Sequence, residues 1–228
     1  MIHPLDNAVW RALDGPHHDV AQRRGSAARY QPDVAPFAAL PDEPTHDAWD
    51  DLRALVGPGN VAVLFRAEVD APRGWKVPWR GIGFQMLATE PLRGEARDAP
   101  EITPLGLADV DDMTDLVSRT RPGPFLPRTI ALGTYLGIRL NGKLVAMAGE
   151  RMRLPGCTEV SAVCTDDAHR GRGYAAQLVR GVVARIHARD ETAFLHVIED
   201  NTPAIALYEK LGFTVRRTIE AAGLVAPD

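Results

Sequence analysis

The sequence has few cysteines, no long apolar run and no leader-like start, and each absence excludes a class of protein. Only Cys157 and Cys164 occur among the 228 residues, which excludes the disulfide framework of small secreted domains. No apolar run approaches the roughly 18 residues that a membrane-spanning helix needs. The first residues, Met1 to Asp6, lack the charged start and apolar core of a signal peptide. These absences together predict a cytoplasmic protein.

An excess of charge of one sign is also missing. The 26 basic residues are offset by 30 acidic ones, for a net charge of −4, and no basic stripe indicates a nucleic-acid surface. The 7 histidines have no histidine or cysteine partner at ligand spacing, so we expect no bound metal. A content of 45% hydrophobic and 25% charged residues is typical of a globular protein. The length allows one large domain or two small ones.

The most informative stretch is 165–176, with the sequence TDDAHRGRGYAA. An apolar, β-branched run precedes it, and apolar residues at the spacing of one helix face follow it: Leu178, Val179, Val182, Val183 and Ile186. A strand, a glycine turn and a helix are therefore predicted. Such a turn directs free backbone N–H groups and the positive end of the helix dipole at one point. We interpret this turn as a cradle for a pyrophosphate, with Arg170 and Arg172 adding charge.

The spacing of this turn carries a family resemblance. It reads Arg-x-x-Gly-x-Ala from Arg170 to Ala175, and it lacks the Lys-Ser/Thr pair of a nucleotide-triphosphate loop. A second block, 194–213, contains FLHV, then Asn201, then a helix ending in Tyr-x-x-x-Gly-Phe. Both blocks resemble the GNAT superfamily of N-acetyltransferases. The resemblance covers roughly the second half of the chain and is strongest to a subgroup with a long N-terminal extension and mostly unassigned substrates.

The resemblance implies an α/β fold: a mixed, mostly antiparallel central sheet with helices on both faces. It divides the chain into an N-terminal α/β extension, 1–98, and an acetyltransferase domain, 99–228. The extension is either support for the sheet, part of the acceptor pocket, a dimer surface or a degenerate copy of the same fold. Residues 90–101, which are polar and contain proline and glycine, are the expected linker.

Local patterns predict the order of elements. Residues 1–57 are expected to be mostly helical, with Asn7 and Thr45 as caps, followed by strands over 61–65 and 81–87. From residue 101 onward we expect a helix capped by Asp109, a hairpin, a strand, a long helix, a strand, a helix and a final strand. The hairpin turn is Asn141-Gly142. The proline-rich loop 121–127 is either a substrate-shaping loop or an ordinary crossover.

The resemblance also implies which residues bind acetyl-CoA. The backbone of the strand before the turn would pair with the pantetheine arm, the turn would hold the pyrophosphate, and the asparagine after the next strand would contact the arm. Carried over by position, these are Val163, Cys164, Thr165, Arg170, Gly171, Arg172, Gly173, Tyr174, Ala175 and Asn201.

Three side chains are candidates for the chemistry that the resemblance implies. The attacking amine must lose a proton, and the departing thiolate is best protonated. Glu159 matches the catalytic glutamate position of one GNAT branch, and His196 stands where another branch has a glutamate; either could be the base. Tyr208 matches the tyrosine that faces the leaving sulfur and is the expected general acid. Cys164 lies mid-strand without a base in sequence reach and is expected to be buried packing.

The expected function is acetyl-CoA-dependent transfer of an acetyl group directly to an amine of a small molecule or peptide. The alternative is an acetyl-CoA-binding sensor or regulatory module without transferase activity, and transfer of a longer acyl group is a third reading. The near-neutral charge disfavours a polyanionic acceptor. Whether the protein forms a homodimer is left open.

Overall fold

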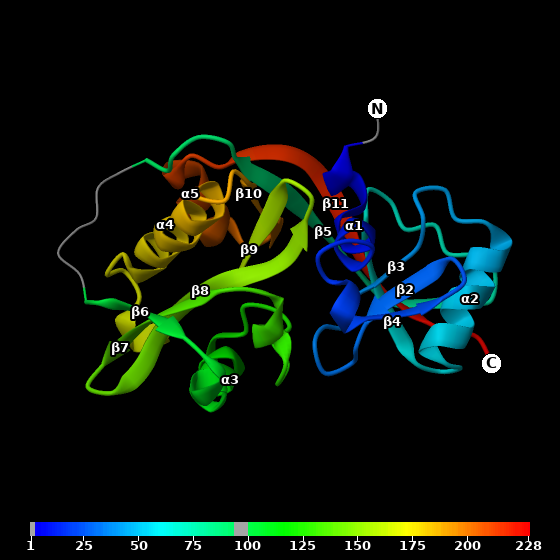
Figure 1. Ribbon diagram of the computed structural model, residues 1–228, viewed down its shortest axis with the longest axis horizontal. Helices are drawn as coiled ribbons and strands as arrows, with labels where there is room; N and C mark the ends of the chain where they lie inside the picture. The colour runs from blue at the N-terminus through cyan, green and yellow to red at the C-terminus, as the bar shows by residue number, and fades with distance from the viewer. Residues whose placement is uncertain (1–2, 94–99) are drawn as a thin grey trace.

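The computed structural model describes residues 3–93 and 100–228 (Figure 1). Its α-helices are α1 (Ala8–Leu13), α2 (His46–Val56), α3 (Val110–Thr120), α4 (Tyr174–His187) and α5 (Thr202–Leu211). The strands are β1 (Ala21–Arg24), β2 (Ala27–Tyr30), β3 (Ala38–Ala39), β4 (Val61–Arg66), β5 (Lys76–Ala88), β6 (Ile102–Leu105), β7 (Tyr135–Leu140), β8 (Lys143–Leu154), β9 (Cys157–Thr165), β10 (Thr192–Ile198) and β11 (Thr214–Val225). The 3-10 helices are η1 (Pro4–Asn7), η2 (His18–Val20), η3 (Leu107–Asp109), η4 (Thr129–Leu132) and η5 (Asp167–His169).

Eight strands form one sheet in the order β4-β11-β5-β10-β9-β8-β7-β6. Only β9 and β10 pair in parallel, and all other neighbours in this sheet are antiparallel. The expected mixed, mostly antiparallel sheet is therefore confirmed. β5, from the N-terminal part of the chain, lies between β10 and β11. The predicted boundary at 98/99 and half of the predicted linker, 90–101, fall within 94–99, outside the described residues.

Both faces of this sheet are covered. Neighbouring residues on a strand point to opposite faces. On β10, Leu195 packs with α4 and α5, whereas Phe194 packs with the N-terminal residues. On β8, Ala148 packs with α4, whereas Met147 packs with α3. Helices α4 and α5 therefore cover one face, and α3 and the N-terminal segment (residues 5–39) cover the other, as Figure 1 shows.

The N-terminal residues contain more sheet than expected. β1, β2 and β3 form a separate three-stranded sheet, where the sequence predicted mostly helix. β1 has the polar sequence AQRR, which gives no strand signal, and Gly25 makes the turn to β2 with φ 45°. The two predicted helices are present, and Thr45 caps α2 by accepting a hydrogen bond from Ala48 N at 3.3 Å. Asn7 instead directs its amide to Leu40 O.

The order of elements from residue 101 is confirmed with one addition, the strand β6. Its Pro104 cannot donate to a ladder, and β6 occupies the edge of the sheet, where proline is tolerated. The hairpin turn lies between β7 and β8 as predicted, with φ of 51° at Asn141 and 80° at Gly142. Within the described ranges, 3–93 and 100–228, no helix is both long and apolar enough to cross a membrane.

Candidate active site

The glycine turn joins β9 to α4 in the conformation that a cradle needs. Asp166 accepts a hydrogen bond from Ala168 N at 3.1 Å and so shapes the turn after the strand. Gly171 and Gly173 have φ of 77° and 82°, in the left-handed region that favours glycine. A Cβ at either position would meet no atom within 4 Å, so both glycines border open space. The helix begins directly after them, and its first N–H groups have no carbonyl partner within the helix.

A cavity of about 710 Å³ lies over this turn. Every residue predicted to bind the cofactor lines it, and so does Tyr208. The size falls within the usual range of small-molecule sites. Residues 121–123 of the proline-rich loop also line the cavity, whereas Phe125 is buried against Tyr135. The loop therefore contributes both to the cavity wall and to the core.

The strands beneath the cavity diverge. β9 and β10 pair only at Cys157–Thr192, Thr158–Ala193 and Glu159–Phe194. Beyond these pairs β9 has a bulge, where Ala162 has φ 52°, while β8 continues to pair along its other side. The edge of β9 that carries Val163, Cys164 and Thr165 is therefore unpaired where it meets the cavity, so its backbone groups are open to an extended ligand.

Two residues that line this cavity have a buried polar atom without a hydrogen-bond partner. Thr165 Oγ1 and His169 Nδ1 are buried and make no hydrogen bond in the described structure. A buried polar group left without a partner costs free energy, so a ligand with polar groups fits here. Asn201, which also lines the cavity, caps α5 with Oδ1, which accepts from Ala204 N at 3.3 Å.

Burial raises the pKa of two side chains that line the cavity. Burial, with a smaller contribution from Cys164, raises the pKa of Tyr208 to about 12, so this hydroxyl keeps its proton near neutral pH. Burial also raises the pKa of the Cys164 thiol to about 11. Because the thiolate is the reactive form of cysteine, Cys164 is an unreactive wall residue, as expected.

Glu159 lies outside this cavity. Its side chain is 0% exposed, on the sheet face that the N-terminal segment covers. Arg151 Nε donates to its Oε2 at 2.7 Å and Nη2 donates to its Oε1 at 2.6 Å. Burial alone would raise the pKa of Glu159, but Arg151 and His196 lower it to about 2. A carboxylate so stabilised is a weak base.

His196 lies beside Glu159 and, like it, is not among the residues that line the cavity; its side chain is 7% exposed. Its Nδ1 is 2.7 Å from Glu159 Oε1, and its Nε2 is 3.1 Å from Gln85 Nε2. Sequence reasoning missed Arg151 and Gln85. For Gln85 the available signal was an amide side chain between two apolar residues of a strand, Phe84 and Met86. Arg151 stands in the mostly charged stretch 150–153, which gives no such signal.

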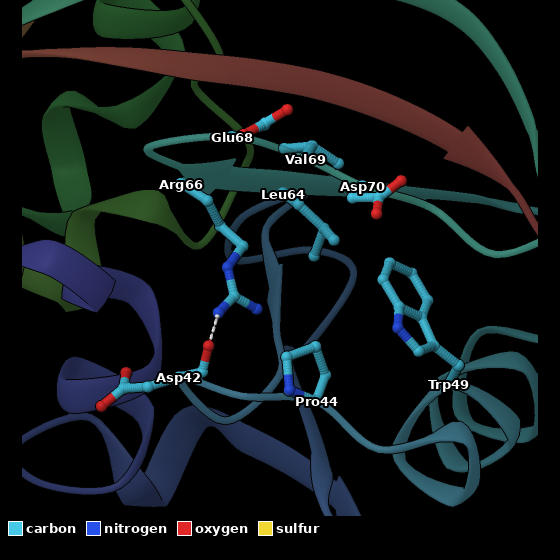
Figure 2. Close-up of a pocket in the computed structure, with 8 residues that line it drawn as sticks. All are labelled: Asp42, Pro44, Trp49, Leu64, Arg66, Glu68, Val69 and Asp70. Carbon is cyan, nitrogen blue, oxygen red and sulfur yellow. Dashed lines mark hydrogen bonds between the residues drawn. The ribbon is translucent and has the colours of Figure 1, made fainter.

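A second hollow, of about 230 Å³, lies on the N-terminal residues (Figure 2). Trp49, Pro44 and Leu64 form its apolar side, and Arg66 enters it while donating to the carbonyls of Pro41 and Asp42. None of the predicted site residues lines it. No group of three His, Cys, Asp or Glu side chains suited to a metal ion occurs in the part of the chain that the structure describes.

Comparison with known proteins shows which family the chain resembles. The family model described as FR47-like protein matches residues 135–221. A crystal structure of a putative acetyltransferase from the GNAT family of Novosphingobium aromaticivorans is 40% identical, covers 100% of both chains and superposes with a TM-score of 0.89.

Two curated relatives match over shorter segments. Mycothiol acetyltransferase of Corynebacterium glutamicum is 39% identical over 74 residues, which is 32% of this chain and 25% of that protein. The N-alpha-acetyltransferase RimI of Mycobacterium tuberculosis is 39% identical over 82 residues, 35% of this chain and 51% of that protein. The matched segment thus spans between a quarter and about half the length of these relatives.

Proposed function

The chain belongs to the GNAT family of acetyltransferases, and we propose that it transfers an acetyl group from acetyl-CoA directly to the amine of a small molecule or peptide, in the cytoplasm. The observation that carries the proposal is the cavity that brings the glycine turn, the unpaired edge of β9 and Tyr208 together.

The residues present fit acetyl-CoA. Arg170 and Arg172 and the N–H groups at the start of α4 suit a pyrophosphate, and open space at Gly171 and Gly173 leaves room for it. The free backbone edge from Val163 to Thr165 suits the amides of pantetheine. When bound, acetyl-CoA supplies an activated thioester. Binding energy far from the thioester then positions the acetyl group.

Tyr208 is the proposed general acid. In the transfer, the amine nitrogen forms a bond to the acetyl carbon, the carbon–sulfur bond breaks, and the sulfur takes a proton. Tyr208 lines the cavity, and its raised pKa of about 12 keeps the hydroxyl protonated until sulfur needs the proton. Solvent then returns a proton to the phenolate.

For the base that takes the amine proton we propose His196 in place of Glu159. Both carboxylate oxygens of Glu159 are already hydrogen-bonded, to Arg151 and to His196, so neither is free for a substrate. His196 follows the last β9–β10 pair by two residues, at the point where the strands diverge. Among the described residues, only the neutral amide of Gln85 hydrogen-bonds its Nε2. Neither side chain lines the cavity, so the proposal requires an acceptor amine to reach Nε2 by displacing this amide.

A binding module without transferase activity is the second candidate. One observation favours it: the described structure already provides hydrogen-bond partners for both ring nitrogens of His196 and both oxygens of Glu159. The acceptor itself does not follow from the relatives, because their matched segments cover only 32% and 35% of this chain.

The test is calorimetric titration with acetyl-CoA, followed by a thiol-release assay over a panel of amines, amino acids and short peptides. Binding with thiol release on one acceptor class supports the transferase and defines its substrate class. Binding without release on any acceptor supports the module. Absence of binding contradicts both.

A further inference from the structure

A row of polar side chains crosses five adjacent strands beneath the N-terminal segment. Arg151 on β8 holds Glu159 on β9, Glu159 contacts His196 on β10, and His196 contacts Gln85 on β5. On β11, Arg216 Nη1 donates to Gln85 Oε1 at 2.7 Å. The row thus runs through the point where β9 and β10 separate.

The row ends in the N-terminal segment, in η1. Asp6 Oδ1 accepts from both Arg216 Nη2 and Arg217 Nη1 at 2.6 Å. Consecutive strand residues normally point to opposite faces, but the pairing of β11 with β5 shifts between Val215 and Arg217. This bulge turns both arginines toward Asp6. Burial opposes ionisation of Asp6, but the hydrogen bonds from the arginines hold its pKa below the ordinary value.

The partners of Gln85 fix the orientation of its amide. Its Oε1 must accept from Arg216, because a guanidinium only donates. Its Nε2 must donate to Leu5 O, 3.0 Å away, because a carbonyl only accepts. If the amide were rotated by half a turn, its NH2 group would face the Arg216 donor and its oxygen would face the Leu5 carbonyl, and neither hydrogen bond could form. The second hydrogen of Nε2 therefore points at His196 Nε2.

The protonation of His196 follows from its two neighbours. Gln85 donates to Nε2, so this nitrogen must carry a lone pair. Nδ1 faces the ionised carboxylate of Glu159 at 2.7 Å, so this nitrogen must carry the proton. The other charged groups of the row, Arg151, Arg216 and Asp6, make no hydrogen bond to the ring in the described structure; each is held by another partner. The rings of Phe65 and Phe194 pack beside the imidazole.

We propose that Asp6 and Leu5 of the N-terminal segment act through Arg216 and Gln85 as positioning residues that hold His196 neutral, with its proton on Nδ1. The segment thereby serves the site, although it touches no part of the cofactor cavity. The consequence for catalysis rests on the proposed function: Nε2 keeps the lone pair that a base needs, and an acceptor amine takes the place of the Gln85 donor. A buried partner that fixes an imidazole tautomer is known to matter greatly to rate in other enzymes.

The direct test is long-range proton–nitrogen NMR of the full-length protein with labelled histidine, without acetyl-CoA. The signals of His196 are assigned by their loss in His196→Gln. We expect a protonated Nδ1 and an unprotonated Nε2 in the wild type. Gln85→Leu keeps volume but removes the donor to Nε2, while Glu159 still holds the proton on Nδ1; we therefore expect the Nε2 signal to shift toward that of a protonated nitrogen. A wild-type ring protonated on Nε2, or signals unchanged by Gln85→Leu, would overturn the proposal.

A matched pair of variants tests the role of the N-terminal segment, and it also serves if Gln85→Leu fails to fold. Asp6 and Asp109 are alike: each receives a backbone N–H at the start of a 3-10 helix, His3 N at 3.0 Å and Gly106 N at 2.8 Å, and each binds arginine. We expect Asp6→Asn to alter the His196 signals and Asp109→Asn to leave them unchanged. Equal effects of both variants, or none from Asp6→Asn, would contradict the proposal.

A kinetic readout separates this inference from the proposed function. On an acceptor found by the thiol-release assay, Gln85→Leu should lower kcat by about tenfold or more, because a positioned base contributes at least that much. The dissociation constant for acetyl-CoA should stay within about twofold, because Gln85 does not line the cavity. If acetyl-CoA does not bind at all, the proposed function fails while the tautomer result stands. An unchanged kcat contradicts the positioning role.

Discussion

Arg151 and Glu159 form a bidentate ion pair in the interior, with Nε–Oε2 and Nη2–Oε1 distances of 2.7 and 2.6 Å. The guanidinium also lies over the ring of Phe37, 4.8 Å from its centroid. The pair therefore joins β8 and β9 to the N-terminal segment. Removing one partner would leave the other charge buried, which makes the pair important for stability whatever its part in the reaction.

We predict that Glu159→Gln destabilises the protein by about 3 kcal/mol, because an uncompensated buried charge typically costs that much or more. Urea unfolding followed by circular dichroism measures the change. The control is the double variant Arg151→Met with Glu159→Gln, which removes the orphaned charge and should recover part of the loss. A loss below about 1 kcal/mol in Glu159→Gln would show that Arg151 finds other partners.

The same pair predicts how stability depends on pH. The pKa of Glu159 is lowered from 4.5 to about 2 in the folded protein. Because the unfolded chain takes up the proton first as pH falls, the stabilisation is complete above about pH 4.5 and is lost progressively toward pH 2. Urea unfolding across this window should show a steeper decline for the wild type than for Glu159→Gln. Parallel curves would contradict the lowered value.

We predict that Tyr208→Phe slows turnover by about a hundredfold, as loss of a general acid does, and changes acetyl-CoA affinity less than about threefold. Steady-state kinetics and calorimetry give the two numbers. Tyr135→Phe is the control, since it also removes a buried phenol hydroxyl but does not line the cavity. An equal loss of rate and affinity in Tyr208→Phe would indicate a packing role, through its edge-to-face contact with Phe213.

We predict that Gly173→Asp weakens acetyl-CoA binding by about a hundredfold, or ~2.7 kcal/mol, because it places a carboxylate in the space proposed for the pyrophosphate. Gly142→Asp is the control: its φ of 80° is close to the 82° of Gly173, and a Cβ there also meets nothing within 4 Å. Both variants carry the same backbone strain, so only the cradle differs. Similar affinities in the two variants would refute the cradle.

Local sequence signals made most elements after residue 101 predictable. Glycines in the left-handed region, the spacing of one helix face and the Asn141-Gly142 turn are short-range signals, and the elements that they predicted are present. The edge strand β6 was missed because Pro104 is normally read as a break. β1 was missed because its residues are polar and its pairing with β2 depends on the fold.

The network around His196 could not be predicted from spacing, because it depends on strand order. Gln85 reaches His196 only because β5 inserts between β10 and β11. Arg216 and Arg217 share Asp6 only because β11 has a bulge. The sequence did indicate that Gln85 has a partner, because an amide side chain between apolar residues of a buried strand needs one. It did not say which partner.

The insertion of β5 between β10 and β11 has a consequence for synthesis on the ribosome. Gln85 and His196 are 111 residues apart, so β5 leaves the exit tunnel long before either strand that it will pair with. Until then its backbone donors and acceptors are free to pair with other chains. Pairings over such sequence distances form slowly. We therefore expect the completion of this central sheet, late in translation, to be the step at which the nascent chain is most exposed to aggregation and most dependent on chaperones.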